Sequence, residues 1–183
     1  MAEAKPTVQK QRRGARVVVN GSGSTNVATG LPVLDHLLTL LAEHASFDLA
    51  LEVAPGGADE EIGDAGRALG QALAETLDPA RSRGHGSAIV PADEALAHVA
   101  LEASGRPLVV SNVDLSDARV AGLHTDLADR FLRELAEGAG LTLHVRLIEG
   151  QDTQHVLDAI FKALGVALAQ ACTPLKRKKA ARG

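Results

Sequence analysis

The sequence predicts an α+β domain in which β-sheets pack on helices, built from two similar half-domains. Three observations carry this prediction: a short internal repeat, a helix–strand–helix pattern that occurs twice, and strand-like segments ahead of each pattern. Strands and helices do not alternate regularly, which favours an α+β sandwich over a doubly wound βαβ fold. A length of 183 residues fits one domain.

The internal repeat consists of two matches at nearly the same offset. LAE at 41–43 recurs at 135–137, and RALGQALA at 67–74 recurs as KALGVALA at 162–169. One single-residue insertion reconciles the offsets of 94 and 95 residues. We interpret this as a duplication, with repeats at about 15–92 and 93–175.

In the first half, residues 16–19 predict a strand and residues 35–44 predict a helix with leucines on one face. Apolar residues alternate with others over 49–53, as a half-buried strand requires. The glycine-rich segment 55–57 predicts a loop. Over 62–77 apolar residues recur every three or four positions, which predicts an amphipathic helix.

The second half shows the same order. Residues 95–101 and 107–113 predict strands, and residues 125–137 predict a helix. Leucine and valine alternate cleanly over 141–147, which predicts a half-buried strand. Apolar residues at helical spacing follow over 157–168.

The composition excludes several classes of protein. Apolar residues make up 45% and charged residues 23%, which is typical of a soluble globular protein. No apolar run reaches 18 residues and no signal-peptide core is present, so we expect neither a membrane span nor Sec export. The single cysteine, Cys172, excludes an intramolecular disulfide or a cysteine-based zinc site, and fits a cytoplasmic location. With three Phe and no Trp or Tyr, the chain lacks the aromatic platforms of nucleic-acid readers, so no nucleic-acid partner is expected.

Charge is strongly segregated along the chain. The ends, 1–16 and 176–183, are basic and are predicted to be tails. Positions 17–175 hold 9 basic and 22 acidic residues, a net of −13. Solvated tails are one explanation. An anion site, or pairing of the tails with acidic faces of sister subunits, is another.

Five motifs lie in order along residues 17–176. NGSG at 20–23 resembles a DGxG turn, and TGLPVLDHLL at 29–38 resembles TGxxFFDHML. PADEAL at 91–96 is similar to PMDEAL, and SGRP at 104–107 matches SGRP. Residues 142–163 resemble TLHxxxxxGxNxHHxxEAxFKA. Together these motifs resemble the imidazoleglycerol-phosphate dehydratase family of histidine biosynthesis.

The resemblance implies internally duplicated half-domains with two mixed β-sheets packed on a layer of helices, similar to the ribosomal S5 domain 2-like fold. It also implies a metal-held 24-mer with octahedral symmetry and two manganese ions bound by eight side chains. Imidazole and carboxylate ligands that converge from several segments suit such an ion. In the family the ion holds the imidazole ring of the substrate, which helps a carbon-bound proton to leave before water is expelled.

Most of the implied ligand positions hold other residues. The HHTVED pattern of the family aligns with DEEIGD at 59–64, EHFF aligns with DRFL at 129–132, and HHxxE aligns with QHVLD at 154–158. Of eight expected ligands only His36 and His155 remain, with Asp158 as a shortened replacement. The substituted positions are Asp59, Gly63, Arg130 and Gln154.

The resemblance leaves two unequal candidate sites. The first retains His36, Glu60 and Asp158, with Gln154 as a weak neutral ligand. In the second, Arg130 and Asp59 stand beside His155 and Gly63. A guanidinium cannot bind a cation, so we expect this second site to be lost, with Arg130 replacing the ion's charge by pairing with Asp59. We therefore expect no cofactor, or manganese at the first site if any.

Four other histidines, His85, His98, His124 and His144, are predicted to be surface or hydrogen-bonded strand residues. A salt bridge would explain the spacing of His155 and Asp158 as well as a metal does.

Substrate-binding positions are also depleted. No Asp or Glu occurs between residues 4 and 34, so the N-terminal glutamate that lies in the family's substrate site is absent. Arg106 and Lys176 remain as candidate contacts for a phosphate group.

Three functions are consistent with these residues. The chain is interpreted first as a non-catalytic structural or regulatory homologue, because its motifs survive where they pack and change where they would react. The alternatives are a functional dehydratase with a reduced metal site, and a binder or enzyme for another phosphorylated or anionic small molecule. In each case we expect a homo-oligomer.

Overall fold

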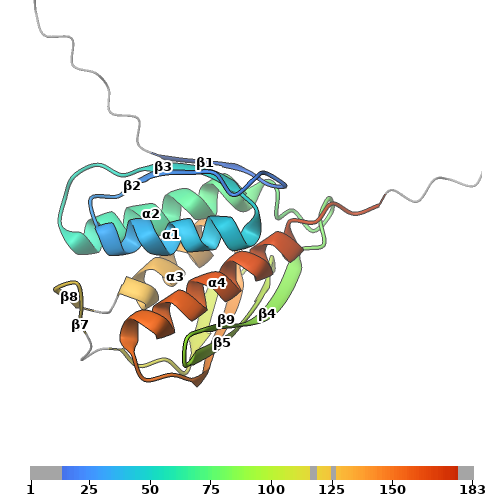
Figure 1. Cartoon of the computed structure of the whole chain (residues 1–183). Coiled ribbons are helices and arrows are strands. Elements are labelled where there is room, and N and C mark those ends of the chain that lie inside the picture. Colours follow the sequence, from blue (N-terminus) through green and yellow to red (C-terminus); the bar gives the residue numbers. More distant parts are fainter. Residues whose placement is uncertain (1–13, 116–118, 125–126, 177–183) are drawn as a thin grey trace, which may run out of the picture.

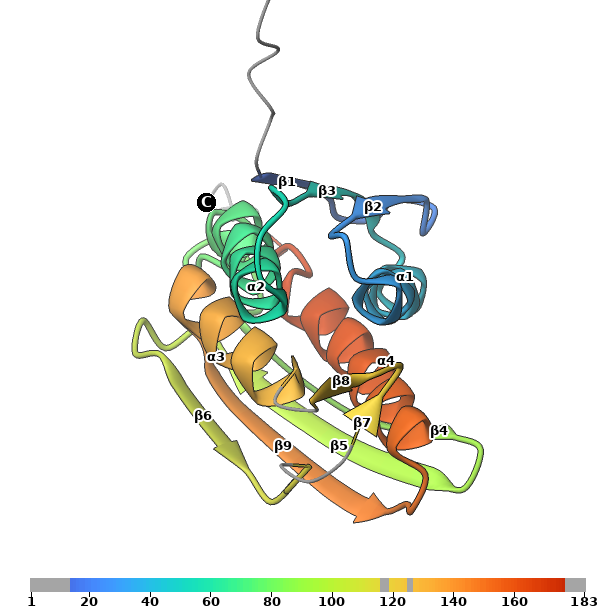
Figure 2. The same cartoon turned by 90° about the vertical axis from the view of Figure 1, so that its left-hand side faces the viewer.

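Four helices form a layer between two β-sheets in the computed structural model of the chain (Figure 1, Figure 2). The structure describes residues 14–115, 119–124 and 127–176. The elements, in chain order, are β1 (Gly14–Val18), β2 (Thr25–Ala28), α1 (Pro32–Ala45), β3 (Asp48–Glu52), α2 (Ala58–Ala74), β4 (His85–Ala92), β5 (Ala95–Glu102), β6 (Leu108–Ser111), β7 (Arg119–Val120), β8 (Leu123–His124), α3 (Leu127–Ala139), β9 (Thr142–Glu149) and α4 (Thr153–Ala171).

The two sheets share one pairing pattern. In the first sheet, of order β1-β3-β2, β3 runs antiparallel to β1 and parallel to β2. In the second sheet, of order β4-β5-β9-β6, β9 runs antiparallel to β5 and parallel to β6. Each half therefore contains a strand–helix–parallel strand unit followed by a second helix. This confirms the predicted α+β class with duplicated halves and mixed sheets. The remaining pair, β7 and β8, is a short hairpin.

The structure contains two strands that were not predicted, and one predicted tail is shorter than expected. The strands β2 and β4 were not predicted, because β2 has few apolar residues and β4 contains Gly86 and Pro91, which weaken a strand signal. Residues 85–92, which the predicted first repeat includes, form β4 and pair with β5 in the sheet of the second half. Arg16 lies in β1, so the predicted N-terminal tail of 1–16 is too long. The remainder of that tail, and residues 177–183 of the other, lie outside the described residues.

The helices pack in two close pairs, α2 against α3 and α1 against α4. Glycines let the backbones approach. A Cβ added at Gly66 would lie 2.5 Å from the carbonyl oxygen of Phe131, and one at Gly70 would lie 2.6 Å from that of Leu135. A Cβ at Gly165, on α4, would overlap the carbonyl oxygen of Leu41 on α1. These distances show that the backbones of each helix pair are in direct contact.

We expect Gly165→Ala to destabilise the protein by about 1–3 kcal/mol, since an overpacked core must move its backbone. The sign of the change in unfolding free energy is informative, because alanine in a helix is otherwise about 1 kcal/mol more stable than glycine. Gly57→Ala is the matched control: its Cβ would meet nothing within 4 Å, so the cost is limited to an altered helix cap, below about 1 kcal/mol. Urea unfolding midpoints measure both. A more stable Gly165→Ala variant would show that the two backbones are not in contact.

No helix in the described part of the chain is long and apolar enough to cross a membrane.

Candidate functional site

Two of the sequence motifs form turns that position the candidate site. The carboxylate of Asp35 accepts hydrogen bonds from the backbone N–H of Thr29 (2.9 Å) and from its hydroxyl (2.6 Å), which sets the start of α1 and therefore His36. The backbone N–H groups of Ser22, in the NGSG turn, and of Ser24, directly after it, donate to Asp48, and these bonds lower the pKa of Asp48. Ser22 of the first motif and Thr29 and Asp35 of the second therefore have structural partners.

A first cluster joins α1 to α4. The Oδ1 atom of Asp158 lies 3.2 Å from Nε2 of His36 and accepts a hydrogen bond of 2.7 Å from the amide of Gln154. Glu60, predicted to complete this site, is not among them. Its carboxylate faces the N-terminus of its own helix, where Gly57 donates to it at 3.4 Å. Within one chain the structure thus brings together three of the four predicted residues.

A second cluster surrounds His155. Its Nδ1 lies 2.5 Å from the carboxylate of Glu94, and its Nε2 lies 3.4 Å from that of Asp93. The other oxygen of Glu94 accepts the backbone N–H of Asp152 at 2.9 Å. Both ring nitrogens therefore face carboxylates of the same chain. His155 pairs with Glu94 rather than with Asp158, because the β4–β5 turn brings Glu94 to His155 across 61 positions of sequence. The salt bridge that the spacing of His155 and Asp158 allowed is therefore not the one seen.

These contacts shift two pKa values in opposite directions. The N–H of Asp152, followed by His155, lowers the pKa of Glu94 from 4.5 to about 2. The hydrogen bond to Glu94 raises the pKa of His155 above 6.5. A protonated imidazole has no free lone pair, so this arrangement favours an ion pair over metal coordination.

We expect Glu94→Gln to lower the pKa of His155 toward its ordinary value of 6.5. The Glu94 contribution to stability is present above pH 4.5 and is lost as pH falls toward 2. The His155 contribution is present below pH 6.5 and is lost as pH rises through its raised pKa. The pair therefore contributes most between pH 4.5 and 6.5. NMR titration of the imidazole C–H signals checks this, with Glu137→Gln as a control. An unchanged His155 titration in Glu94→Gln would contradict the assigned partner.

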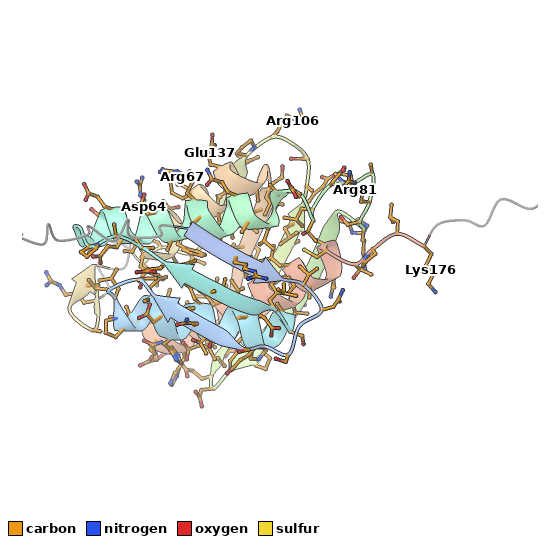
Figure 3. The ribbon with its side chains drawn as sticks, turned by 90° about the horizontal axis from the view of Figure 1, so that it is seen from above. Asp64, Arg67, Arg81, Arg106, Glu137 and Lys176 are labelled. Carbon is orange, nitrogen blue, oxygen red and sulfur yellow. The ribbon has the colours of Figure 1, made fainter. Side chains whose placement is uncertain are left out.

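Arg130 occupies the space that a side chain at position 63 would take. Its Nε and Nη2 atoms lie 3.0 Å from the position of a Cβ at Gly63. Its Nη1 lies 3.2 Å from Glu134, one turn along the same helix. Glu134 is mostly buried and also accepts a 2.5 Å hydrogen bond from Arg67, which approaches Asp64 at 3.6 Å. Figure 3 shows Arg67 and Asp64 together on α2.

Within one chain Arg130 pairs with Glu134 and not with Asp59, so the predicted Arg130–Asp59 pair stays a prediction for contacts between chains. Helical spacing places Glu134 next to Arg130, and the missing side chain of Gly63 leaves room for the guanidinium. Sequence reasoning missed Glu134, although its i,i+4 position was a usable signal. It also missed the buried Glu61, whose carboxylate accepts the N–H of Gly56 at 3.0 Å beside Gly30.

The donor set does not fit a dimanganese centre within one chain. Among residues 14–115, 119–124 and 127–176, no group of three His, Cys, Asp or Glu side chains could hold a metal ion. The surviving histidines lie in separate clusters, and Arg130 brings a positive charge beside the Gly63 position.

The two candidate phosphate contacts do not converge either. Arg106 is exposed in the SGRP turn, where its N–H donates to Ser104. Lys176 follows α4, next to Leu175, whose N–H donates to the carbonyl oxygen of Arg81. Figure 3 shows Arg106 and Lys176 on separate segments, not pointing toward one another.

The fold and site together define an α+β protein of two duplicated halves in which candidate ligand positions are engaged by ion pairs and hydrogen bonds. Residues 29–168 match the imidazoleglycerol-phosphate dehydratase family. The chain is 42% identical over 155 residues to an imidazoleglycerol-phosphate dehydratase of Acetivibrio thermocellus, covering 82% of this chain and 79% of that protein. It is 43% identical over 162 residues to one of Syntrophobacter fumaroxidans, covering 86% and 82%.

Solved structures agree with these sequence relatives. The dehydratase of Staphylococcus aureus has a TM-score of 0.80 and 35% identity, with 91% of this chain and 97% of that chain covered. That of Pyrococcus furiosus, in complex with (S)-C348, has a TM-score of 0.78 and 30% identity, covering 95% and 98%. The chain belongs to the imidazoleglycerol-phosphate dehydratase family.

Proposed function

We propose that this chain is a member of the family that has lost the dimanganese site and acts as a structural or regulatory homologue rather than as a dehydratase. The observation that carries the proposal is the seating of Arg130 over Gly63, where it binds Glu134. The family's ligands at these two positions are a glutamate and a histidine. Their replacements pack together as a pair, which is expected of a site rebuilt without an ion.

The remaining ligand positions support the same proposal. His155 is held by Glu94 and Asp93, and Glu60 faces the start of its own helix. A divalent ion would have to displace these partners before it could bind. The missing N-terminal carboxylate removes a further group of the family's substrate site.

We also propose a homo-oligomer, for which the 24-mer of the family is the reference assembly. The solved relatives align over nearly their whole length, and the chain keeps the same layers of sheets and helices. The acidic body and basic ends supply complementary charge. Ion pairs such as those of Arg130 stabilise little when exposed and more when an interface removes water from them.

A dehydratase with a reduced metal site is the second candidate. Relatives above 40% identity carry that name, and His36, Asp158 and Gln154 remain together at the N-termini of α1 and α4. A role in binding a phosphorylated molecule has weaker support, because Arg106 and Lys176 do not meet in one chain.

Titration of the purified protein with manganese should give no saturable heat by calorimetry. The reason is that His155 and His36 are already bound to carboxylates, and that Arg130 places a positive charge beside Gly63. Metal content should be negligible, and EDTA should leave the size of the assembly unchanged. An intact family member is the positive control. Stoichiometric manganese binding with dehydration would establish the second candidate instead.

A further inference from the structure

The duplication leaves one strand of the second half without a counterpart. In the second sheet β4 pairs with β5 and packs on α4, where the backbone N–H of Ser87 donates to Gln170 at 2.9 Å. In the first half β1 corresponds to β5, and α2 corresponds to α4, but β1 is an edge strand that lies over α2 (Figure 2). No strand of the described residues pairs with its outer edge. An open edge of this kind can accept a further extended segment.

The helix surface beside this edge is uncovered as well. Ala68 and Ala72 of α2 are half-buried, whereas Ala163 and Ala167, their counterparts 95 positions later on α4, are buried. An open hollow of about 280 Å³ lies between the end of the sheet and α2. We call it the β1–α2 groove, and its lining includes Gly14, Glu52, Asp64, Arg67, Ala68 and Gln71. The first half therefore has an open groove where the second half has β4.

The register of the two sheets identifies the segment that corresponds to β4. Val18 pairs with Asp48, and Glu102 pairs with Thr142, which is the counterpart of Asp48 at the 94-residue offset. Val18 therefore corresponds to Glu102, which lies 84 positions later. The pairings of β2 and β6 with their partners give the same offset of 84. Applied to β4, this offset gives residues 1–8, which lie outside the described residues.

The sequence of residues 1–8 suits an edge strand in this place. Ala2, Ala4, Pro6 and Val8 would correspond to the inward residues of β4, and polar residues stand between them at positions 3, 5 and 7. This alternation is typical of a half-buried strand. A proline is tolerated on an edge strand, where its missing N–H would face away from the sheet.

Two residues of β1 would gain partners in this register. The pairing of β4 with β5 would set Glu3 opposite Arg16 and Met1 opposite Val18. Over the described part of the chain Arg16 forms no ion pair at 4.0 Å or less, and the apolar Val18 is 45% exposed. Glu3 is the single acid of residues 1–13. Opposite charges and apolar pairs directly across two antiparallel strands stabilise their pairing.

The same offsets assign a partner to Lys10. Glu94, which binds His155, would correspond to Lys10, and His155 corresponds to Glu60 at the 95-residue offset of α2 and α4. Glu60 is exposed, and within the described residues its carboxylate accepts a hydrogen bond only from Gly57, at 3.4 Å. A lysine at the place of Glu94 would thus meet a carboxylate at the place of His155. The pair would carry the same charges in reversed order.

We propose that residues 1–8 bind the β1–α2 groove as a fourth, antiparallel strand, and that the turn after them places the ammonium group of Lys10 beside Glu60. Lys10 then neutralises one of the residues left at the first candidate metal site, and its positive charge opposes a divalent ion there. The proposal goes beyond the loss of the metal site proposed above and does not depend on it, because the placement follows from the duplication.

A disulfide between positions 4 and 15 tests the strand. In the full chain with Cys172→Ser, Ala4→Cys and Ala15→Cys should join under oxidised glutathione, since residues directly opposite one another bring their Cβ atoms within about 5.5 Å. Ala4→Cys with Val17→Cys is the matched control, because this diagonal pair lies about 7–8 Å apart and should join at least about tenfold more slowly. Digestion and peptide masses identify the bond. Equal rates in the two pairs would show that the segment does not keep this register and would overturn the proposal.

Charge reversal tests the same register independently. Added to the Ala4→Cys and Ala15→Cys pair, Arg16→Glu should slow disulfide formation by about fivefold, because it sets like charges opposite one another. Glu3→Arg together with Arg16→Glu should restore the rate. A slow rate that Glu3→Arg does not restore would contradict the pairing of Glu3 with Arg16.

A zero-length crosslink tests the position of Lys10. A carbodiimide should join the Lys10 amine to the Glu60 carboxylate as an amide, with loss of one water, which peptide masses detect. Lys10→Arg should remove this product, and Lys5→Arg is the control that should keep it. A disulfide without the Lys10–Glu60 amide, or an amide from Glu60 to another lysine, would overturn the assignment of Lys10. Neither experiment measures manganese binding or dehydration, so the inference can fail while the loss of the metal site stands.

Discussion

A histidine auxotroph that lacks imidazoleglycerol-phosphate dehydratase should not grow on minimal medium when this chain is its only replacement. Metal polarisation typically contributes several kcal/mol to the transition state of such reactions. A loss of about 4 kcal/mol corresponds to about a thousandfold in rate. In this chain Arg130 lies over Gly63, and His155 is bound to Glu94. The purified protein, assayed with added manganese, should show the same loss.

The comparison needs an intact family member expressed to the same level, because poor folding would also prevent growth. Circular dichroism and the size of the assembly check that this chain is folded. Growth at the wild-type rate would overturn the proposed function and favour a dehydratase with a reduced metal site.

Restoring the ligands should restore manganese binding. The variant combines six substitutions: Asp59→His, Glu60→His, Gly63→Glu, Arg130→His, Gln154→His and Asp158→Glu. The close packing of the glycines on α2 and α4 holds the helices in place, so imidazole and carboxylate groups should return to positions that an ion can use. Calorimetry should show saturable manganese binding that the unmutated protein lacks. Activity should stay low, because the N-terminal carboxylate remains absent.

Two of these substitutions depend on each other. Glycine in a helix interior is unfavourable, so Gly63→Glu appears harmless from helix propensity alone. In the structure its Cβ would lie 3.0 Å from two guanidinium nitrogens of Arg130. Gly63→Glu should therefore be better tolerated with Arg130→His than without it, which a double-mutant cycle of unfolding free energies measures. If the six-fold variant folds but binds no manganese, the alignment of the site is wrong.

The fold was largely predictable because it depends on local patterns that the sequence repeats. Apolar residues at helical spacing predicted the helices, the 94- and 95-residue offsets related the two halves, and alternating apolar residues predicted β3 and β9. The edge strand β4 was missed because Gly86 and Pro91 interrupt its pattern, and an edge position tolerates both residues. Its partner β5 lies between β4 and β9 in the sheet, and its buried residues alternate with partly exposed ones. This strand was predicted.

The candidate site was predictable as a set of positions but not as a set of partners. Alignment with the family indicated which residues stand at ligand positions. The pairs that these residues form, such as His155 with Glu94, depend on a turn that brings distant segments together. Arg130 shows the same limit. Opposite charge suggested Asp59 as its partner, whereas the i,i+4 spacing on α3 places Glu134 beside it.

The glycine contacts between helices have a consequence for how this chain can change over generations. Where backbones touch, as at Gly66, Gly70 and Gly165, the helices cannot slide or rotate to compensate for an altered residue. Replacements at the helix N-termini must then be absorbed by side chains alone, as they are at Gly63 and Arg130. Lineages that descend from this chain should accumulate substitutions at the helix ends while these three glycines stay fixed. Selection on the packing of the helices would then act separately from selection on the residues of the site.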